Sequence, residues 1–247
     1  MASFSSRTLD GEIKDRKMTS QPYAAIEIWL MMRDILSAVK VLHDNDYILF
    51  DLAPENISVG PGRKLMLSHF SAIKKLPNNR TYGVNYGNGT VEERHELFDH
   101  IERLTNPHYR SPEASVMGDI IKRSTDIWSL GCVLYAIAFL KTPFAEAAEK
   151  TGRSIGWLVQ KPSDYLYIER REAYRHLRVV ITTLAHAEED KRPSVNDLLN
   201  GVLVPSPPAN TRRTICLLPS QDRSSRSPQR RNTVQRTASR QPLLRED

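Results

Sequence analysis

Residues 127–140 form the most apolar stretch of the chain and contain no charged side chain. A helix that is apolar all round has to be covered on every side, so this stretch predicts a buried central helix. At 14 residues it is shorter than the roughly 20 residues that a membrane-spanning helix needs. We therefore expect a mainly α-helical domain packed around this helix, and no membrane span.

Three other segments carry apolar residues at three- and four-residue steps, which is the repeat of an amphipathic helix. They are residues 23–44, residues 171–187 and a short final helix from Ser194 to about Gly201. The apolar residues of the first two repeats are Ile28, Met31, Met32, Ile35, Val39, Leu42, Tyr174, Leu177, Val180, Ile181 and Leu184. Asp197, three positions after Ser194, suits a capping box at the start of the last helix.

Short β-strands are expected between the helices. Residues 47–50 form an apolar run, and residues 57–59 and 64–67 flank a Gly-Pro-Gly hairpin turn. The polar stretch 74–106 indicates a long surface loop around a short helical piece at residues 91–104. The predicted β content is therefore one or two small hairpins.

The two ends of the chain differ from its middle. Residues 1–22 are polar and lack a helical repeat, so the first helix is expected after Pro22. Residues 204–247 contain nine arginines and three acidic residues, which accounts for the formal net charge of +6. They contain no aromatic residue and are rich in Arg, Ser and Pro, which predicts a disordered basic tail. The folded domain is expected over residues 23–203.

Cysteine use and the N-terminal composition indicate an intracellular protein, cytoplasmic or nuclear. Cys132 lies in the apolar run and Cys216 in the tail, so they do not make a disulfide framework, and no secretory signal is evident. His95 and His100 are five residues apart, not the four of a metalloprotease helix, so no metal site is expected. Without aromatic residues for stacking, the tail is not expected to bind nucleic acid specifically.

Four motifs occur in the order that eukaryotic protein kinases use. They read D-L-A-P-E-N at residues 51–56, P-H-Y-R-S-P-E at 107–113, D-I-W-S-L-G at 126–131 and D-K-R-P-S at 190–194. The first resembles the catalytic loop H-R-D-L-K-P-E-N, and the others resemble the end of the activation segment, the central helix and a run near the end of the domain. Over about residues 24–202 the chain thus resembles the large lobe of a Ser/Thr protein kinase, a mainly α lobe with short hairpins.

The resemblance implies roles for five retained residues. Glu113 is expected to pair with Arg192 in a buried ion pair, and removing one partner of such a pair typically costs about 3–5 kcal/mol. Asp126 is expected to accept hydrogen bonds from the backbone of the catalytic loop. Asp51 and Asn56 stand where the family has its catalytic base and a metal ligand.

Other catalytic positions are replaced. Ala53 stands where the family has a lysine that neutralises phosphoryl charge. His69, or Ser68 in an alternative alignment, stands where the aspartate of D-F-G binds Mg²⁺. Asn106 replaces the threonine before the P-x-Y sequence, and Phe50 replaces the arginine before the catalytic aspartate. The resemblance therefore implies a degenerate, pseudokinase-like scaffold that uses no ATP or magnesium, both of which an active kinase would need.

The resemblance also implies that the small ATP-clamping lobe is absent. Only 22 residues precede the first expected helix, and they contain neither a G-x-G-x-x-G turn nor a V-A-I-K lysine. The face that this lobe covers in kinases would then be open and apolar, which predicts a protein partner there. A truncated gene model is an alternative explanation of the missing lobe.

Three functions stay open at this point. The first is a pseudokinase-like interaction or regulatory module, and the second is a Ser/Thr kinase or kinase fragment that uses Asp51 as base and ATP as donor. The third is a non-functional gene remnant. In the tail, Thr214, Thr233 and Ser239 follow arginines in patterns that resemble sites for basophilic kinases, where a phosphate would reverse the local charge.

Overall fold

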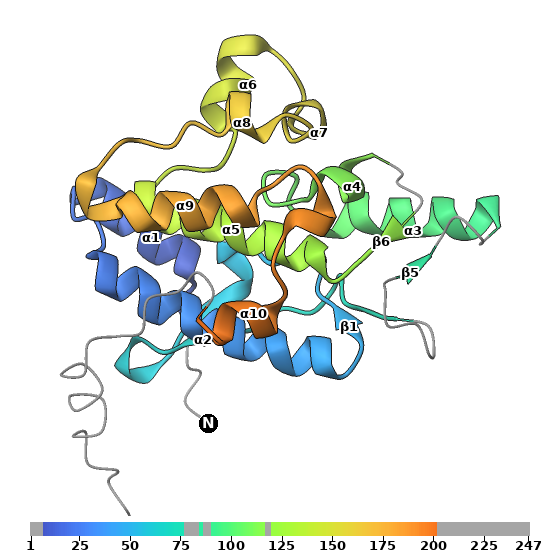
Figure 1. Ribbon diagram of the computed structural model, residues 1–247, viewed down its shortest axis with the longest axis horizontal. Coiled ribbons are helices and arrows are strands. Elements are labelled where there is room, and N and C mark those ends of the chain that lie inside the picture. The colour runs from blue at the N-terminus through green and yellow to red at the C-terminus, as the bar shows by residue number, and fades with distance from the viewer. Residues whose placement is uncertain (1–6, 77–83, 86–89, 117–119, 202–247) are drawn as a thin grey trace, which may run out of the picture. The chain divides into compact units, whose positions relative to one another are not determined.

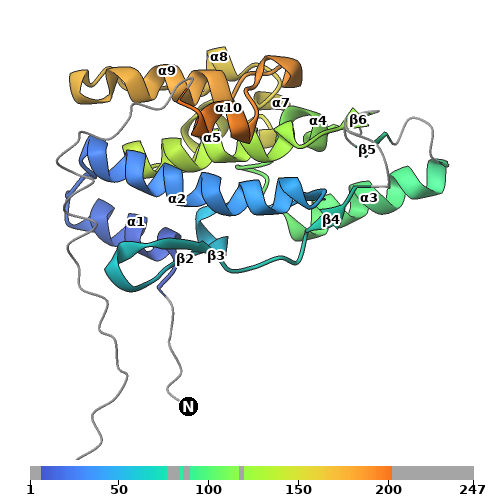
Figure 2. The ribbon, with the colours of Figure 1, turned by 60° about the horizontal axis from the view of Figure 1, so that its bottom comes forward.

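The protein is a helical domain built around one buried helix. The structure, a computed structural model, describes residues 7–76, 84–85, 90–116 and 120–201. The central helix is α5 (Ser124–Phe139), and Figures 1 and 2 show α9 (Arg175–Leu184) on one side of it and α2 (Ala25–Asp44) on the other. The central helix and both flanking helices predicted from the sequence are confirmed.

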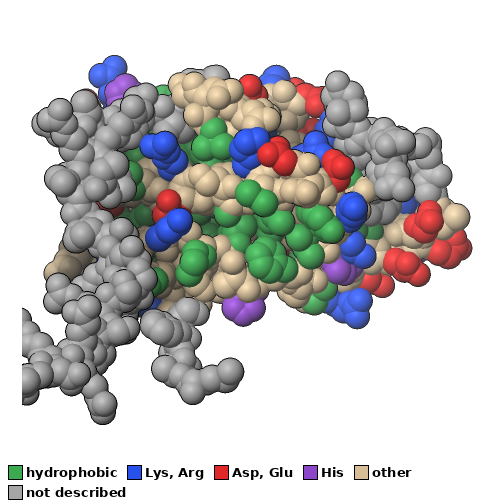
Figure 3. Space-filling view, turned by 90° about the horizontal axis from the view of Figure 1, so that it is seen from below, with side chains coloured by type: hydrophobic (Ala, Val, Ile, Leu, Met, Phe, Trp, Pro, Cys, Tyr) green, Lys and Arg blue, Asp and Glu red, His purple; other side chains and the backbone are tan. Residues whose placement is uncertain are grey.

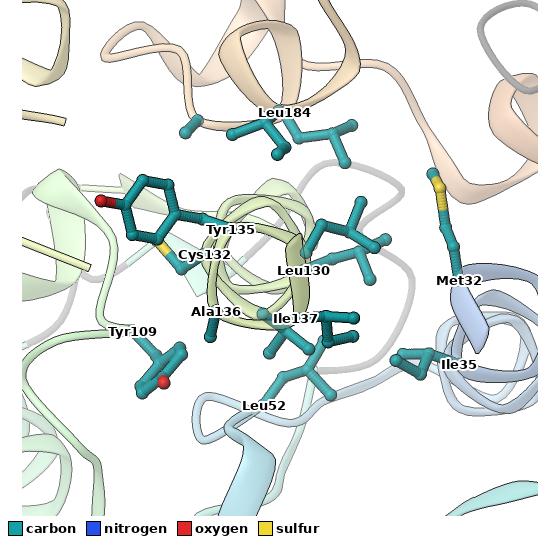
Figure 4. Close-up of a cluster of buried hydrophobic side chains, with 14 of the residues drawn as sticks. Met32, Ile35, Leu52, Tyr109, Leu130, Cys132, Tyr135, Ala136, Ile137 and Leu184 are labelled. Carbon is teal, nitrogen blue, oxygen red and sulfur yellow. The ribbon is translucent and has the colours of Figure 1, made fainter. Parts of the chain in front are cut away.

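Helix α5 is covered on all sides. Every residue from Thr125 to Phe139 is buried. Figure 4 shows Met32 of α2, Leu184 of α9 and Leu52, which follows the apolar run 47–50, around it. Since each large apolar side chain contributes about 1.5–3 kcal/mol when fully buried, this helix makes a large contribution to the hydrophobic stabilisation of the domain.

The close approach of α5 and α9 depends on Gly131. A Cβ atom at this position would lie 2.9 Å from the Cβ of Leu184 and 3.1 Å from the backbone nitrogen of Ala185. Real Cβ atoms essentially never come within the first distance, so only glycine lets the two helices pack at their present separation.

The strands form small antiparallel pairs. Within the described ranges these pairs are β1 (Tyr47–Ile48) with β4 (Lys74–Lys75), β2 (Ile57–Val59) with β3 (Leu65–Leu67), and β5 (Val84–Asn85) with β6 (Ile120–Ile121). The predicted hairpin is the β2–β3 pair, joined by the turn η2 (Pro61–Arg63), in which Gly62 has a φ of 66°. The run at 47–50 gives a shorter strand than predicted, because Phe50 has a φ of 62° and cannot continue an extended strand.

Helix α1 (Leu9–Met18) was not predicted, and the expectation that the first helix follows residue 22 is wrong. Leu9 and Ile13 lie in the main hydrophobic core, so this core extends N-terminally of the predicted boundary at residue 23. The sequence pattern is weak here because those two residues are the only apolar ones that α1 buries, among mostly charged neighbours.

Polar contacts also fix the segment around α1. The backbone nitrogen of Val59 donates to the carbonyl of Arg7 at 2.8 Å, which extends the edge of the hairpin. The buried carboxylate of Glu12 accepts a hydrogen bond from the hydroxyl of Tyr23 at 3.1 Å and pairs with Arg63. This pairing compensates for the burial of the Glu12 charge.

The remaining helical segments complete the domain. Helix α3 (Val91–Leu104) has the bounds predicted for it, and α10 (Val195–Leu199) begins with the predicted capping box of Ser194 and Asp197. The other segments are η1 (Pro54–Asn56), α4 (Pro112–Ser115), α6 (Ala145–Thr151), α7 (Ile155–Leu158), α8 (Pro162–Tyr165), η3 (Glu172–Tyr174) and η4 (Glu189–Lys191). In the part of the chain that the structure describes, no helix is both long and apolar enough to cross a bilayer.

Candidate functional site

The candidate site is the loop between β1 and η1, and the buried carboxylate of Asp126 holds its first residues. Asp126 lies in the first turn of α5 and is fully buried. It accepts hydrogen bonds from the backbone nitrogens of Leu49 at 3.0 Å and Phe50 at 3.1 Å. The Nε2 atom of His43 lies 2.8 Å from the same carboxylate. Charge-assisted bonds of this kind are among the strongest in proteins, so they fix the loop backbone to the central helix.

Phe50 is held in a conformation that non-glycine residues rarely adopt. A residue in the left-handed region typically costs about 1–3 kcal/mol and persists only where its surroundings determine it. Here the bond to Asp126 fixes the Phe50 backbone, and its side chain is buried in a second hydrophobic cluster. The other buried members of this cluster are Ile48, Ala72, Leu76, Leu97, Ile101, Ala114 and Ile121. Phe50 therefore packs against apolar side chains of α3. The kinases that this chain resembles have an arginine at the position of Phe50.

Asp51 follows directly, and both of its carboxylate oxygens are engaged within the chain. Oδ1 accepts from the backbone nitrogen of Asn106 at 2.8 Å, and Oδ2 accepts from the side-chain amide of Asn56. The same amide donates to the Asp51 carbonyl at 3.0 Å. Burial raises the pKa of Asp51 above its ordinary value, and the bonds from Asn106 and Asn56 offset this rise in part.

Asn106 links the activation segment to the catalytic loop. Its side-chain nitrogen donates to a carboxylate oxygen of Glu55 at 2.6 Å, and its side-chain oxygen accepts from the backbone nitrogen of His108 at 3.0 Å. An asparagine before a proline is typical of such a turn. The residue that was predicted only as a departure from the family is therefore a connector in this chain.

The other replaced positions differ in burial. Ala53 is fully buried, and His69 is exposed. The hydroxyl of Ser68 lies 3.2 Å from Nδ1 of His69 and also donates to the carbonyl of Asn56 at 3.0 Å. The structure therefore brings Asp51, Asn56 and Ser68 together, while the imidazole of His69 reaches toward solvent.

Glu113 and Arg192 form a buried, two-pronged ion pair between α4 and the residue before Pro193. The guanidinium nitrogens lie 2.7 and 2.9 Å from the two carboxylate oxygens. Arg192 also donates to the carbonyls of His186 at 2.8 Å, Ala187 at 3.1 Å and Ser124 at 3.1 Å. With five bonds, the arginine ties the activation segment, the start of α5 and the loop after α9 into one unit.

Sequence reasoning missed Arg110, which anchors α3. Its buried guanidinium forms an ion pair with Glu102 and donates to the hydroxyl of Thr105 at 2.9 Å and the carbonyl of Thr105 at 3.1 Å. Leu97 and Ile101 hold α3 in the second hydrophobic cluster. The four-residue spacing of those two residues was the available signal for a docked helix.

The histidines of α3 and the residues of the predicted tail were the other positions singled out in the sequence. No group of three or more potential metal-ligating side chains occurs among the residues that the structure describes. His100 lies on α3 with Nε2 3.1 Å from the carbonyl of Ala72. Thr214, Thr233 and Ser239 lie outside the described residues, as does the whole predicted tail.

Comparison with known proteins decides the family. A family model of the protein kinase domain matches residues 5–204, which is most of the chain and includes α1. The chain belongs to the protein kinase family. The four motifs found in the sequence therefore mark homologous segments, and the Asp51 loop is the catalytic loop of a kinase-family domain.

Three relatives illustrate the similarity of this kinase-family domain to Ser/Thr kinases. It is 27% identical over 178 residues to the probable serine/threonine-protein kinase nek2 of Dictyostelium discoideum, covering 70% of this chain and 36% of that protein. It is 27% identical to the calcium and calcium/calmodulin-dependent serine/threonine-protein kinase of Lotus japonicus, covering 77% and 33%. The mouse (Mus musculus) serine/threonine-protein kinase 16 is 27% identical, with 85% and 66% covered. The chain thus spans about a third of the length of the first two relatives.

The ion pair of Glu113 makes stability depend on pH in a defined direction. Burial has the largest single influence and raises the pKa of Glu113, but the hydrogen bonds and charge of Arg192 outweigh it and hold this pKa below its usual value. A carboxylate with a lowered folded-state pKa contributes stability that is present above its unfolded pKa, near ~4.3. That contribution is lost as the pH falls through the folded-state pKa.

We predict that Glu113→Gln lowers the free energy of unfolding by about 3–5 kcal/mol near neutral pH, because it leaves Arg192 buried without its carboxylate. Urea denaturation of both proteins measures this difference, which should shrink as the pH falls below about 4. Glu146→Gln, which removes an exposed partner of Lys150, is the control and should change little. If the two proteins differed in unfolding free energy by the same amount at neutral and acid pH, the lowered pKa of Glu113 and its charge pairing with Arg192 would be contradicted.

Proposed function

We propose that this kinase-family domain is a catalytically impaired pseudokinase that acts as a protein-interaction or regulatory module. The arrangement around Asp51 carries the proposal. Its two carboxylate oxygens accept hydrogen bonds from Asn106 and Asn56, and the uncharged Ala53 is fully buried two residues further on. This supports a structural role for Asp51, in which it joins the catalytic loop to the activation segment.

The donor set around the loop supports the same proposal. Magnesium requires hard oxygen ligands in near-octahedral geometry, usually with carboxylates among them. Asn56 can offer a magnesium ion only its amide oxygen, since its amide nitrogen donates to Asp51, and the chain after β3 supplies a serine at 68 and a histidine at 69 in place of a carboxylate. These residues do not fit a magnesium ion that carries ATP phosphates, so we propose that the domain works without either cofactor.

A second candidate is a Ser/Thr protein kinase that uses Asp51 as its base and ATP as donor. The raised pKa of Asp51, caused mainly by burial, favours it, because a carboxylate with a higher pKa accepts a proton more readily. The names of the relatives also favour it, since all three are serine/threonine-protein kinases. A longer form of this protein with a glycine-rich loop and a strand lysine would support the same reading.

The partner site that we propose lies beside the catalytic loop, where the small lobe of a kinase docks. Met66 on β3 is 46% exposed, and Phe70 just beyond that strand is 45% exposed. Seen from below, hydrophobic side chains gather in the middle of this face, with both basic and acidic side chains around them (Figure 3). Exposed apolar groups so close to an otherwise buried loop are typical of a surface that another protein covers.

We further propose an intracellular location, cytoplasmic or nuclear, in keeping with the free and buried thiol of Cys132. Thr214, Thr233 and Ser239 are proposed as modification sites in the basic tail. A phosphate on any of them would reverse the local charge. Mass spectrometry of the protein from its own cells would test the modification directly, and unmodified tail peptides throughout would argue against it.

The cofactor part of the proposal is tested by thermal unfolding of the full chain with and without ATP, in magnesium and in EDTA. A ligand at 100 times its dissociation constant adds about 2.7 kcal/mol to stability, which raises the midpoint visibly. We predict no rise in either buffer. An active Ser/Thr kinase in the same buffers is the positive control, and a magnesium-dependent rise for this chain would favour the second candidate.

The partner part is tested by a photo-reactive phenylalanine analogue introduced at Phe70 in cells. We predict covalent adducts with one defined protein, because the exposed ring would lie in the interface. The same analogue at Val91, which is 53% exposed at the start of α3, is the matched control and should give none. Equal adduct patterns from the two positions would mean that the face beside the catalytic loop has no special role.

A further inference from the structure

A pocket lies away from the catalytic loop, between the α7–α8 region and the C-terminal half of α9. Its volume is about 550 Å³. Figure 1 shows α8 above α9, and the lining comes from residues 160–164, 166 and 168 on one side and from 178, 182 and 185–187 on the other. The catalytic loop contributes no residue to it, so the pocket is a separate feature of the domain.

The partly buried residue Arg178 is the main feature of this pocket. Arg178 points from α9 and lines the pocket, and no described carboxylate forms an ion pair with it. Most other arginines of the described residues, such as Arg110 and Arg192, do have acidic partners. Removing a charge partly from water without a partner is unfavourable, so an unpaired arginine in a pocket is suited to an anionic ligand.

Two more basic groups line the same pocket. Lys161 lies at the start of α8, and its ammonium forms no ion pair within the described part of the chain. Nδ1 of His186 accepts a hydrogen bond from the backbone nitrogen of Glu188 at 3.0 Å, which leaves Nε2 as the donor toward a ligand. The one carboxylate in the lining is that of Asp164, which is exposed and accepts from the hydroxyl of Ser163 at 3.1 Å. Basic groups therefore predominate.

The walls of the pocket are fixed by the same contacts that hold the domain together. Arg192 donates to the carbonyls of His186 and Ala187, and so holds one wall in place through its ion pair with Glu113. On the other side, the amide of Gln160 donates to the carbonyl of Pro112 at 3.1 Å. Both walls are thus tied to α4, at the end of the activation segment, so the backbone on each side of the pocket is held in place.

The lining is also partly apolar. Leu166, Ile168 and Ala185 lie beside the basic groups, with Leu166 and Ala185 buried. A free phosphate ion would leave these side chains without a contact. A peptide that carries a phosphoryl group on one residue and an apolar side chain beside it would use both kinds of surface.

We propose that this pocket binds a phosphorylated segment of a partner polypeptide, with Arg178, Lys161 and His186 around the phosphoryl group. Arginine binds phosphate oxygens through two parallel hydrogen bonds, which makes Arg178 the main determinant of affinity. The site is independent of the catalytic loop. Loss of the proposed pseudokinase role would therefore leave it standing.

The test measures binding of the full chain to a fluorescein-labelled pool of degenerate peptides with a central phosphoserine, by fluorescence anisotropy. The matching pool with serine is the control for the phosphate. We expect the phosphoserine pool to bind, and Arg178→Ala to weaken binding at least about tenfold, the effect of losing one charge-assisted contact. Arg178→Lys should retain part of the affinity, because it keeps the charge and loses the two-pronged geometry.

Arg175→Ala is the matched control. Arg175 lies on the same helix, is 76% exposed, does not line the pocket and comes no closer than 4.0 Å to Glu172. Both variants keep the basic tail, so unspecific attraction affects them equally, and thermal unfolding verifies that both are folded. Equal affinities of the two variants would overturn the proposal. Competition by inorganic phosphate at the same concentration as the peptide would overturn the assignment of a peptide ligand.

Discussion

The domain depends on the buried carboxylate of Asp126 at the start of its central helix. This carboxylate accepts two backbone hydrogen bonds from the catalytic loop and lies in contact with His43. Those bonds hold Phe50 in a left-handed conformation, and this conformation sets the direction of the backbone at Asp51. Without them the strained backbone would relax, and the contacts of Asp51 with Asn56 and Asn106 would be lost.

The activation segment is attached to this scaffold by contacts that need no phosphate. Phe50 packs in the second hydrophobic cluster, which also holds α3. The guanidinium of Arg110 donates to the carbonyl of Thr105 at the end of α3. Asn106 then joins the segment to Asp51, and Glu113 anchors its end on Arg192. Each attachment is an apolar or charge-assisted contact between groups of this chain, so the described residues from α3 to Glu113 are held in place without an added charge.

Much of this could be predicted from the sequence where the signal is local. The all-apolar run gave the central helix, a Gly-Pro-Gly turn gave the β2–β3 hairpin, and motif order gave the pairing of Glu113 with Arg192. Helix α1 was not predicted because it buries few apolar residues. Helices α7 and α8 are too short, at four residues each, to show a periodic pattern. The roles of Asn106 and Arg110, and the pocket at Arg178, arise from contacts between distant segments that spacing alone does not reveal.

We propose that a kinase scaffold persists in this chain without phosphotransfer chemistry. The most direct measurement is incorporation of radiolabelled phosphate from ATP, in magnesium, into the protein itself and into a generic Ser/Thr substrate, for the natural chain and for Asp51→Asn. We predict that the two proteins give the same background, because Asp51 serves as a link between loop and segment. Incorporation by the natural chain that disappears in Asp51→Asn would contradict the claim and establish Asp51 as a catalytic base.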